Sequence, residues 1–159
     1  MGVSGCGKST LGALLAEAFG CPFLEGDSFH SAEAVEKMRG GHPLTDDDRW
    51  PWLDRLAQAS ATTIETHGVA VMACSALRRI YRDRLRANIG APVRFILPDN
   101  SRDRILARLQ NRPDHYMPVS LLDSQLATLE RPTSEEGTMI LSADMPPMEL
   151  RDRSLDWLR

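Results

Sequence analysis

The first nine residues constrain this chain more than any other segment, because they contain the pattern G-x-x-x-x-G-K-S. The pattern runs from Gly2 to Ser9, and a helical spacing of apolar residues follows it directly. Glycines let successive backbone N–H groups point at one anion, and the N-terminus of the following helix adds partial positive charge. The segment therefore predicts a phosphate-binding loop.

The ligands predicted for this loop are ATP and Mg²⁺. We expect Lys8 to bind the β- and γ-phosphates, the Ser9 hydroxyl to complete the coordination of Mg²⁺, and Thr10 to contact the α-phosphate. The remaining loop residues expected to bind the nucleotide are Gly2, Ser4, Gly5, Cys6 and Gly7. Cys6 lies beside Lys8 and a helix N-terminus, which predicts a thiol that alkylating reagents modify. A GTP switch is disfavoured, because neither lysine of the chain stands in the Asn-Lys-x-Asp pattern of guanine-binding proteins.

Short apolar runs alternate with longer amphipathic ones over the rest of the chain. The runs at 22–25, 69–74, 93–97 and 138–141 predict strands. The segments predicted to be helical are 8–19, 31–38, 50–66, 78–87, 102–110, 119–130 and 148–158, with Pro51 in a first helical turn. Alternating strands and helices indicate a single α/β domain, residues 1–159, with a mainly parallel sheet in a layered fold.

The strand that should precede the phosphate-binding loop is missing. Such a loop joins the carboxyl end of an apolar strand to a helix, yet only Met1 precedes Gly2. We expect the working protein to extend upstream by about five to ten mostly apolar residues. The alternatives are a sheet that closes over the gap or borrows a strand from a partner.

Charge and composition limit the classes of binding partner that we expect for this chain. A formal net charge of −3 gives no electrostatic reason to expect nucleic acid or an anionic membrane. The three cysteines have no metal-ligand spacing, and no apolar run approaches membrane-spanning length. We expect a cytoplasmic enzyme with reduced thiols.

Asp27 and His30 follow the strand predicted at 22–25. Ligands of parallel α/β sheets sit at the carboxyl ends of strands, so Asp27 should face the same mouth as the phosphate-binding loop. There it can accept a proton from a substrate hydroxyl or hold a Mg²⁺-bound water. The alternatives are an Asp27 that caps the helix starting near Ser31, and a His30 that is only an ordinary residue at that helix start.

Three blocks of the sequence resemble the gluconokinase family. The first is Gly26-Asp27-x-x-His30 with Lys37-Met38-x-x-Gly41-x-Pro43-Leu44-Thr45-Asp46-x-Asp48-Arg49-x-Pro51-Trp52-Leu53. The second is Cys74-Ser75-Ala76-Leu77-Arg78-x-x-Tyr81-Arg82-x-x-Leu85-Arg86. The third is Arg112-x-x-His115-Tyr116-Met117 with Leu121-Leu122-x-Ser124-Gln125-x-x-Thr128-Leu129-Glu130-x-Pro132. The likeness spans nearly the whole chain, with Ala34 where the family usually has Asn.

The resemblance implies the three-layer fold of the small nucleoside- and shikimate-kinase-like proteins. It also implies transfer of a phosphoryl group from ATP to D-gluconate, giving 6-phosphogluconate, often by a homodimer. An acidic, polyhydroxylated substrate fits the residue types present, because a carboxylate needs a cation and hydroxyls need short polar groups. The cations are Lys37, Arg49, Arg78 and Arg82, and the short polar groups are Asp27, His30 and Ser75.

A helical lid is expected at about residues 108–120. Arg108 and Arg112 lie four residues apart, so both can point at one ligand, and His115 follows them. The resemblance favours lid cations for the transferring phosphoryl group, with Arg112 catalytic beside Lys8 and Asp27 and His115 binding substrate. The alternative is a pair of surface arginines at a helix C-terminus. Adenine is expected near residues 143–146.

Two other functions remain open. One is a kinase for another small acceptor such as shikimate or a nucleoside, which would not share the block from Lys37 to Leu53. The other is a non-catalytic nucleotide-binding regulator, which would not need Asp27 or the lid arginines.

Overall fold

Parallel strands and covering helices alternate along the chain in a computed structural model that describes residues 1–111, 120–132 and 136–159. The strands are β1 (Phe23–Glu25), β2 (Val71–Ala73), β3 (Phe95–Asp99) and β4 (Thr138–Ser142). The helices are α1 (Lys8–Phe19), α2 (Ala32–Arg39), α3 (Asp46–His67), α4 (Arg79–Ile89), α5 (Arg102–Gln110), α6 (Leu121–Thr128) and α7 (Pro147–Leu158), with a 3₁₀ turn η1 (Gly26–Phe29). The α/β class and the parallel pairing predicted from the sequence are confirmed.

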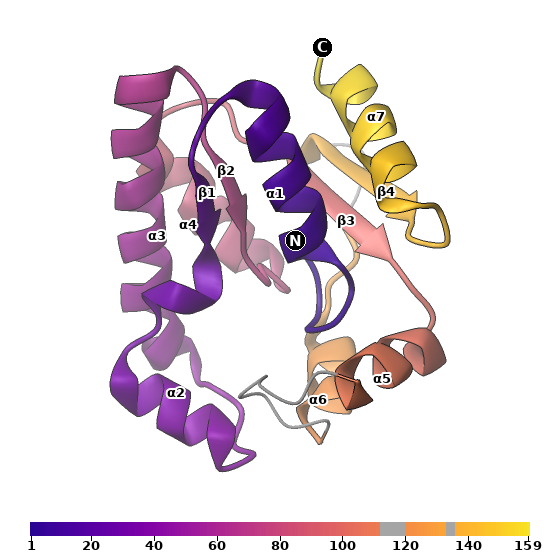
Figure 1. Cartoon of the computed structure of the whole chain (residues 1–159). Coiled ribbons are helices and arrows are strands. Elements are labelled where there is room, and N and C mark those ends of the chain that lie inside the picture. Colours follow the sequence, from indigo (N-terminus) through magenta and orange to yellow (C-terminus); the bar gives the residue numbers. More distant parts are fainter. Residues whose placement is uncertain (112–119, 133–135) are drawn as a thin grey trace.

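The strands form two separate parallel pairs, β1 with β2 and β3 with β4. Figure 1 shows β1 and β2 on one side of α1 and β3 and β4 on the other. Helix α1 packs against α7 on one face of the strands, and α3 packs against α4 on the other. The phosphate-binding loop, η1, α2, α5 and α6 gather at the carboxyl ends of the strands (Figure 1). These segments therefore share one edge of the sheet.

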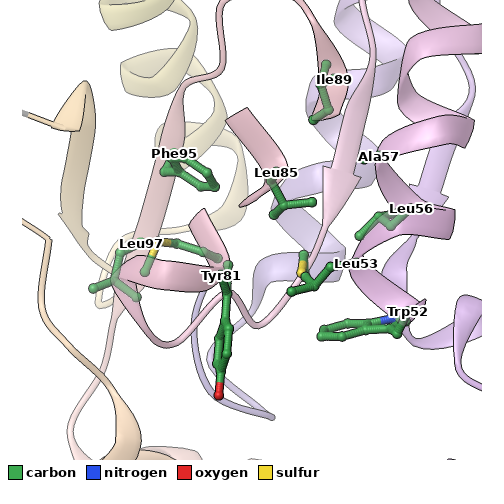
Figure 2. Packing of buried hydrophobic residues seen from close by; sticks show 12 residues of the cluster. Trp52, Leu53, Leu56, Ala57, Tyr81, Leu85, Ile89, Phe95 and Leu97 are labelled. Atoms are coloured by element: carbon green, nitrogen blue, oxygen red, sulfur yellow. The ribbon is translucent and has the colours of Figure 1, made fainter. Parts of the chain in front are cut away.

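The largest apolar cluster lies between α3, α4 and β3 (Figure 2). Trp52, Leu53 and Leu56 of α3 meet Tyr81 and Leu85 of α4. All five side chains are at most 2% exposed. Because a close-packed interior holds backbones in place, this cluster fixes the α3–α4 wall that faces the mouth of the site.

Helix α3 begins earlier than the predicted residue 50, at Asp46. Thr45 caps it: its side chain accepts a hydrogen bond from the N–H of Asp48, and the Asp48 carboxylate accepts one from the N–H of Thr45. This reciprocal arrangement is a capping box, which starts a helix firmly. Pro51 consequently lies inside the helix rather than in its first turn, and that expectation was wrong.

The other boundaries differ by a few residues. Strand β2 covers only residues 71–73 of the predicted 69–74, and α4 begins at Arg79. Within the described ranges, the search for a helix with the length and apolar character needed to span a bilayer found none.

Candidate functional site

The phosphate-binding loop has the backbone geometry that its glycines predict. Gly5 and Gly7 have φ values of 79° and 101°, in the left-handed region that favours glycine. Gly7 is the N-cap of α1, so the first N–H groups of the helix face the loop. A Cβ at Gly2, where φ is 133°, would lie 2.8 Å from the Cys6 sulfur, so the loop closes too tightly for a side chain there.

Lys8 folds back over the loop that it follows. Its Nζ lies 3.4 Å from the carbonyl oxygen of Val3 and makes no ion pair with any described residue. The side-chain amide of Asn100, which follows β3, donates to the carbonyl oxygen of Cys6 at 2.9 Å and ties the loop to that strand. The loop is thus held by neutral contacts while the lysine charge remains available to an anion.

The thiol of Cys6 does not face the ligand side. Cys6 is 1% exposed and packs in a cluster with Val3, Leu77, Ile105 and Leu109. The prediction of a readily alkylated thiol is therefore wrong, because the side chain belongs to the core that supports the loop. Only the backbone of Cys6 remains a candidate for nucleotide binding.

Asp27 lies in η1, where the chain leaves β1. The preceding Gly26 has no room for a side chain, since a Cβ there would lie 2.1 Å from the carbonyl oxygen of Ala73. The indole N–H of Trp52 donates to the carbonyl oxygen of Gly26 at 2.7 Å. Ser31, not Asp27, caps α2, because its hydroxyl accepts the N–H of Ala34 at 3.1 Å. The capping alternative for Asp27 is thus excluded.

His30 is fixed beside Asp27. Its ring stacks on Trp52 with centroids 4.2 Å apart, and its side chain is 4% exposed. Nε2 lies 4.0 Å from Oδ1 of Asp27, and Nδ1 is buried without a hydrogen-bond partner among the described residues. Burial lowers the pKa of His30 to about 4, although Asp27 acts in the opposite direction. At neutral pH the ring is uncharged and offers one donor and one acceptor.

One narrow cleft brings both halves of the predicted site together. Of the predicted residues, it is lined by Ser4 and Lys8 from the phosphate-binding side and by Asp27, His30, Arg49 and Ser75 from the acceptor side. The wall opposite includes Ser124, Gln125 and Thr128 of α6. The lysine of the G-x-x-x-x-G-K-S motif and a carboxylate thus share one cavity, an arrangement that in-line transfer of a phosphoryl group to a hydroxyl requires.

Arg49 belongs to a polar network on the α3–α4 wall. Its Nη1 donates to the Tyr81 hydroxyl at 3.1 Å, and that hydroxyl donates to Asp46 at 2.5 Å. Arg78 also donates to Asp46, at 3.0 Å. The hydrogen bond from Tyr81, and then the charges of Arg78 and Arg49, lower the pKa of Asp46. The network positions Arg49 at the cleft.

Three predicted substrate residues lie outside the lining of this cleft. Lys37 pairs with Asp48 at 2.6 Å, and Arg78 pairs with Asp46 and Glu130. Arg82 is only 1% exposed: it donates to Glu136 at 3.0 Å and to the carbonyl oxygens of Ala76 and Leu77. In this conformation Arg82 holds the segment after β2 in place and does not face the mouth.

The nucleotide side has a second, shallow groove. It is lined by Arg104, Ala107 and Arg108 of α5 and by residues 143–146 after β4, the loop expected near adenine. Arg108 reaches back to the phosphate-binding loop, where its Nη1 lies 3.4 Å from the carbonyl oxygen of Cys6. Arg108 therefore connects the groove to the phosphate-binding loop. Arg112 and His115, and with them most of the expected lid, fall at 112–119, outside the described residues.

Sequence reasoning gave no role to Gln125, Trp52 or Asn100. Gln125 of α6 accepts a hydrogen bond from the N–H of Ser4 at 2.7 Å, which connects the cleft wall to the phosphate-binding loop. Both Gln125 and Trp52 stand in the sequence blocks quoted above, and their place there was the available signal. Asn100 follows directly after β3, where polar residues of an α/β fold reach the site.

The described residues of the site offer few side-chain ligands to a divalent cation. Among the described residues, no group of three or more His, Cys, Asp or Glu side chains could hold a metal ion. Ser9, in the first turn of α1, and Asp27, in the cleft, offer isolated oxygen ligands. Such a site suits Mg²⁺, which keeps several waters and is bound largely through nucleotide phosphates.

Comparisons with known proteins identify relatives of this chain. A family model described as an AAA domain matches residues 1–132. The chain is 43% identical over 141 residues to the thermosensitive gluconokinase of Escherichia coli (strain K12), covering 88% of this chain and 74% of the relative. It is 45% identical over 147 residues to the gluconokinase of Gluconobacter oxydans (strain 621H), covering 92% and 82%. The crystal structure of a gluconokinase from Sinorhizobium meliloti 1021 matches with a TM-score of 0.87 and 43% identity, over 99% of this chain and 88% of that one.

Proposed function

We propose that this chain, which belongs to the gluconokinase family, transfers the γ-phosphoryl group of ATP to D-gluconate and releases ADP and 6-phosphogluconate. The observation that carries the proposal is the cleft that Lys8, Asp27 and Arg49 line together. Lys8 comes from the phosphate-binding loop, whereas Asp27 and Arg49 come from the block that distinguishes this family. A donor site and an acceptor site thus open onto one space.

The nucleotide binds along the phosphate-binding loop. Backbone N–H groups at the end of the loop and the N-terminus of α1 surround the phosphates, and Lys8 binds their terminal oxygens. Arg108, which lies against the loop, adds a second cation. Adenine occupies the groove between α5 and residues 143–146. The Ser9 hydroxyl would help to hold Mg²⁺, which would neutralise negative charge on the transferred group when bound.

Gluconate binds on the other side of the cleft. Arg49 binds its carboxylate, because this guanidinium faces the cleft and its one carboxylate neighbour among the described residues, Asp46, lies 3.8 Å away and is shared with Arg78. Neutral His30 and Ser75 bind hydroxyl groups, since both offer a donor and an acceptor without charge. Lys37, Arg78 and Arg82 position the wall through their own ion pairs.

The chemical step follows from this placement. The terminal hydroxyl oxygen of gluconate forms a bond to the γ-phosphorus while the bond from that phosphorus to the bridging oxygen of ADP breaks. Asp27 accepts the hydroxyl proton, and Lys8 stabilises the charge on the transferred group. Catalysis of this kind depends mainly on position and electrostatics. Arg112 and His115 supply further cations and contacts from the lid.

The test is ADP release with gluconate, shikimate, glycerate and nucleosides as acceptors, in the wild type and in Arg49→Gln. We expect strong stimulation by gluconate alone, and a KM for gluconate at least tenfold higher in the variant, because a charged hydrogen bond is worth about 1.5–3 kcal/mol. Arg151→Gln, on α7, is the matched control and should leave KM unchanged. Equal stimulation by a neutral nucleoside would reject gluconate as the acceptor.

A further inference from the structure

Helix α3 holds both ends of the turn η1, which carries Asp27. At the first end, the indole N–H of Trp52 donates to the carbonyl oxygen of Gly26 at 2.7 Å. At the other end, Nε of Arg55 donates to the carbonyl oxygen of Phe29 at 2.9 Å. On its opposite side Gly26 lies against β2, where an added Cβ would be 2.1 Å from a backbone carbonyl oxygen. The turn is therefore held between α3 and β2.

Trp52 contacts this turn in two different ways. Besides its hydrogen bond to Gly26, its ring stacks on the ring of His30, with centroids 4.2 Å apart and an angle of 18° between the planes. Trp52 is 2% exposed and belongs to the largest apolar cluster (Figure 2). Apolar packing explains the burial of the side chain. The hydrogen bond and the stacked ring, in contrast, act on the residues to either side of Asp27.

The surroundings of His30 decide which ring nitrogen carries the proton. Nε2 lies 4.0 Å from Oδ1 of Asp27, whereas Nδ1 is buried without a hydrogen-bond partner among the described residues. Since buried N–H groups without an acceptor are rarer than buried acceptors without a donor, the proton belongs on Nε2. Hydrogen bonds of catalytic groups are often long without substrate and shorten in its presence. The uncharged ring thus directs its one N–H toward the carboxylate of Asp27.

The charge of the His30 ring matters for a base at Asp27. A protonated imidazole would stabilise the anionic carboxylate and make it a weaker proton acceptor. Burial lowers the pKa of His30 to about 4. The charge of Asp27 opposes this effect, whereas those of Arg55 and Arg49 on α3 add to it. The uncharged ring therefore offers the carboxylate a hydrogen-bond donor without a positive charge.

We propose that Trp52 is a positioning residue for phosphoryl transfer. Its indole N–H fixes the backbone that carries Asp27, and its ring keeps His30 uncharged, with the Nε2 proton directed at the carboxylate. Trp52 acts through these two residues and does not itself touch the transferred group. The inference rests on the role proposed above for Asp27 as acceptor of the hydroxyl proton, and it holds whichever hydroxyl compound is phosphorylated.

Two substitutions separate the two contacts of Trp52. Trp52→Phe keeps an aromatic ring beside His30 but removes the indole N–H, so the carbonyl oxygen of Gly26 loses its donor. Trp52→Leu removes the stacked ring as well. The control is Leu85→Ala, a truncation in the same apolar cluster but on α4, which should lower stability without altering the turn. Each variant is assayed below its melting temperature, with gluconate as the acceptor.

Both substitutions of Trp52 should lower kcat by about tenfold or more, because the base is misplaced, while the KM for ATP stays within about twofold. In Trp52→Leu the pKa of His30 should also rise from about 4 toward its ordinary 6.5, since water reaches the ring. Its kcat should therefore fall more steeply than that of the wild type as the pH drops through this range. Leu85→Ala should keep the kcat and the pH profile of the wild type.

Nitrogen-15 NMR of the histidine side chains tests the inference in the wild type itself, with the His30 signals assigned by their loss in His30→Gln. At about pH 6 we expect an uncharged ring with its proton on Nε2. A charged ring, a proton on Nδ1, or Trp52 variants that lose only stability and keep kcat and the pH profile would overturn the inference. If the wild type phosphorylates only another acceptor, the proposed function fails, and the same comparison of variants with that acceptor decides the inference.

Discussion

The basic residues on the two sides of the cleft differ in whether they form ion pairs with carboxylates of the same chain. On the acceptor side, Lys37, Arg78 and Arg82 are each engaged by a carboxylate of the same chain. On the nucleotide side, Lys8 and Arg108 have no carboxylate partner among the described residues and contact backbone carbonyl oxygens of the loop instead. Paired charges hold a wall in shape, whereas unpaired ones remain available to an anionic ligand.

This difference has a physical reason. A nucleotide brings several negative charges to one place, so cations that are already neutralised would bind it weakly. An acceptor with one carboxylate needs one well-placed cation and a rigid wall of hydrogen-bonding groups. Substitutions on the nucleotide side should therefore affect catalysis, and substitutions of the paired residues should affect stability first.

The largest effect is expected at Lys8. Lys8→Ala should lower kcat by about a thousandfold or more, because the transferring phosphoryl group loses a directed charge. The melting temperature should stay within about 2 °C of the wild type, since the lysine makes no ion pair with a described residue. Steady-state ADP release and thermal unfolding measure the two quantities. A strongly destabilised but normally active variant would contradict the division between the two sides.

The next effect is expected at Arg82, where stability should change. Arg82→Met leaves the buried Glu136 with only the exposed Arg79, at 3.4 Å, as a basic partner among the described residues, and breaking a buried ion pair costs about 3–5 kcal/mol. The double variant Arg82→Met/Glu136→Leu should recover much of that loss, because no unpaired charge remains. Urea unfolding measures the free energies. Arg159→Met, at an exposed pair with Asp156, is the control and should be nearly neutral.

The third effect is a pH dependence of the free energy of unfolding that comes from His30. Its pKa is lowered to about 4 from the ordinary 6.5, so between these values the unfolded chain binds more protons than the folded one. Stability should accordingly fall as the pH drops from 6.5 to 4, by roughly 3 kcal/mol at most from this residue. His30→Gln should flatten the curve in that window, while His67→Gln, at the exposed end of α3, should not. An unchanged slope in His30→Gln would show that the ring is not held uncharged.

The smallest effect is expected at the start of α3. Asp48→Asn weakens both the capping box and the ion pair with Lys37, and a lost cap costs about 1 kcal/mol. The hydrogen bond from Lys37, and then the N–H of Thr45, lower the pKa of Asp48 to about 2. The stabilisation should therefore persist above pH 3.8 and disappear as the pH falls through about 2. Asp47→Asn, in the same turn, is the control for thermal unfolding.

Local signals were sufficient for much of this fold. The phosphate-binding loop and α1 follow from a gapless motif and an apolar spacing, and the parallel pairing follows from the alternation of elements. The sequence prediction began this helix at residue 50 and so missed its first turn, which starts at Asp46. Thr45 and Asp48, three residues apart, carried the capping signal that places the helix start.

The position of a site residue could be predicted from the sequence where the residue directly follows a strand. Asp27 and Ser75 follow β1 and β2, whose carboxyl ends are adjacent, so both were expected at one mouth. Arg82 was not predictable in the same way, because its partner Glu136 lies 54 residues away and no local pattern links the two. The role of Gln125 likewise depends on α6 packing beside the phosphate-binding loop, a tertiary contact that periodicity does not encode.

The most direct measurement is the identity and stoichiometry of the product. The purified chain is incubated with ATP, Mg²⁺ and ¹³C-labelled gluconate, and the mixture is followed by ³¹P and ¹³C NMR. The account predicts one new phosphomonoester signal coupled to the terminal CH₂ carbon of gluconate, formed in equal amount to ADP. ADP formed with free inorganic phosphate and unchanged gluconate, or a phosphate ester on another acceptor only, would contradict it.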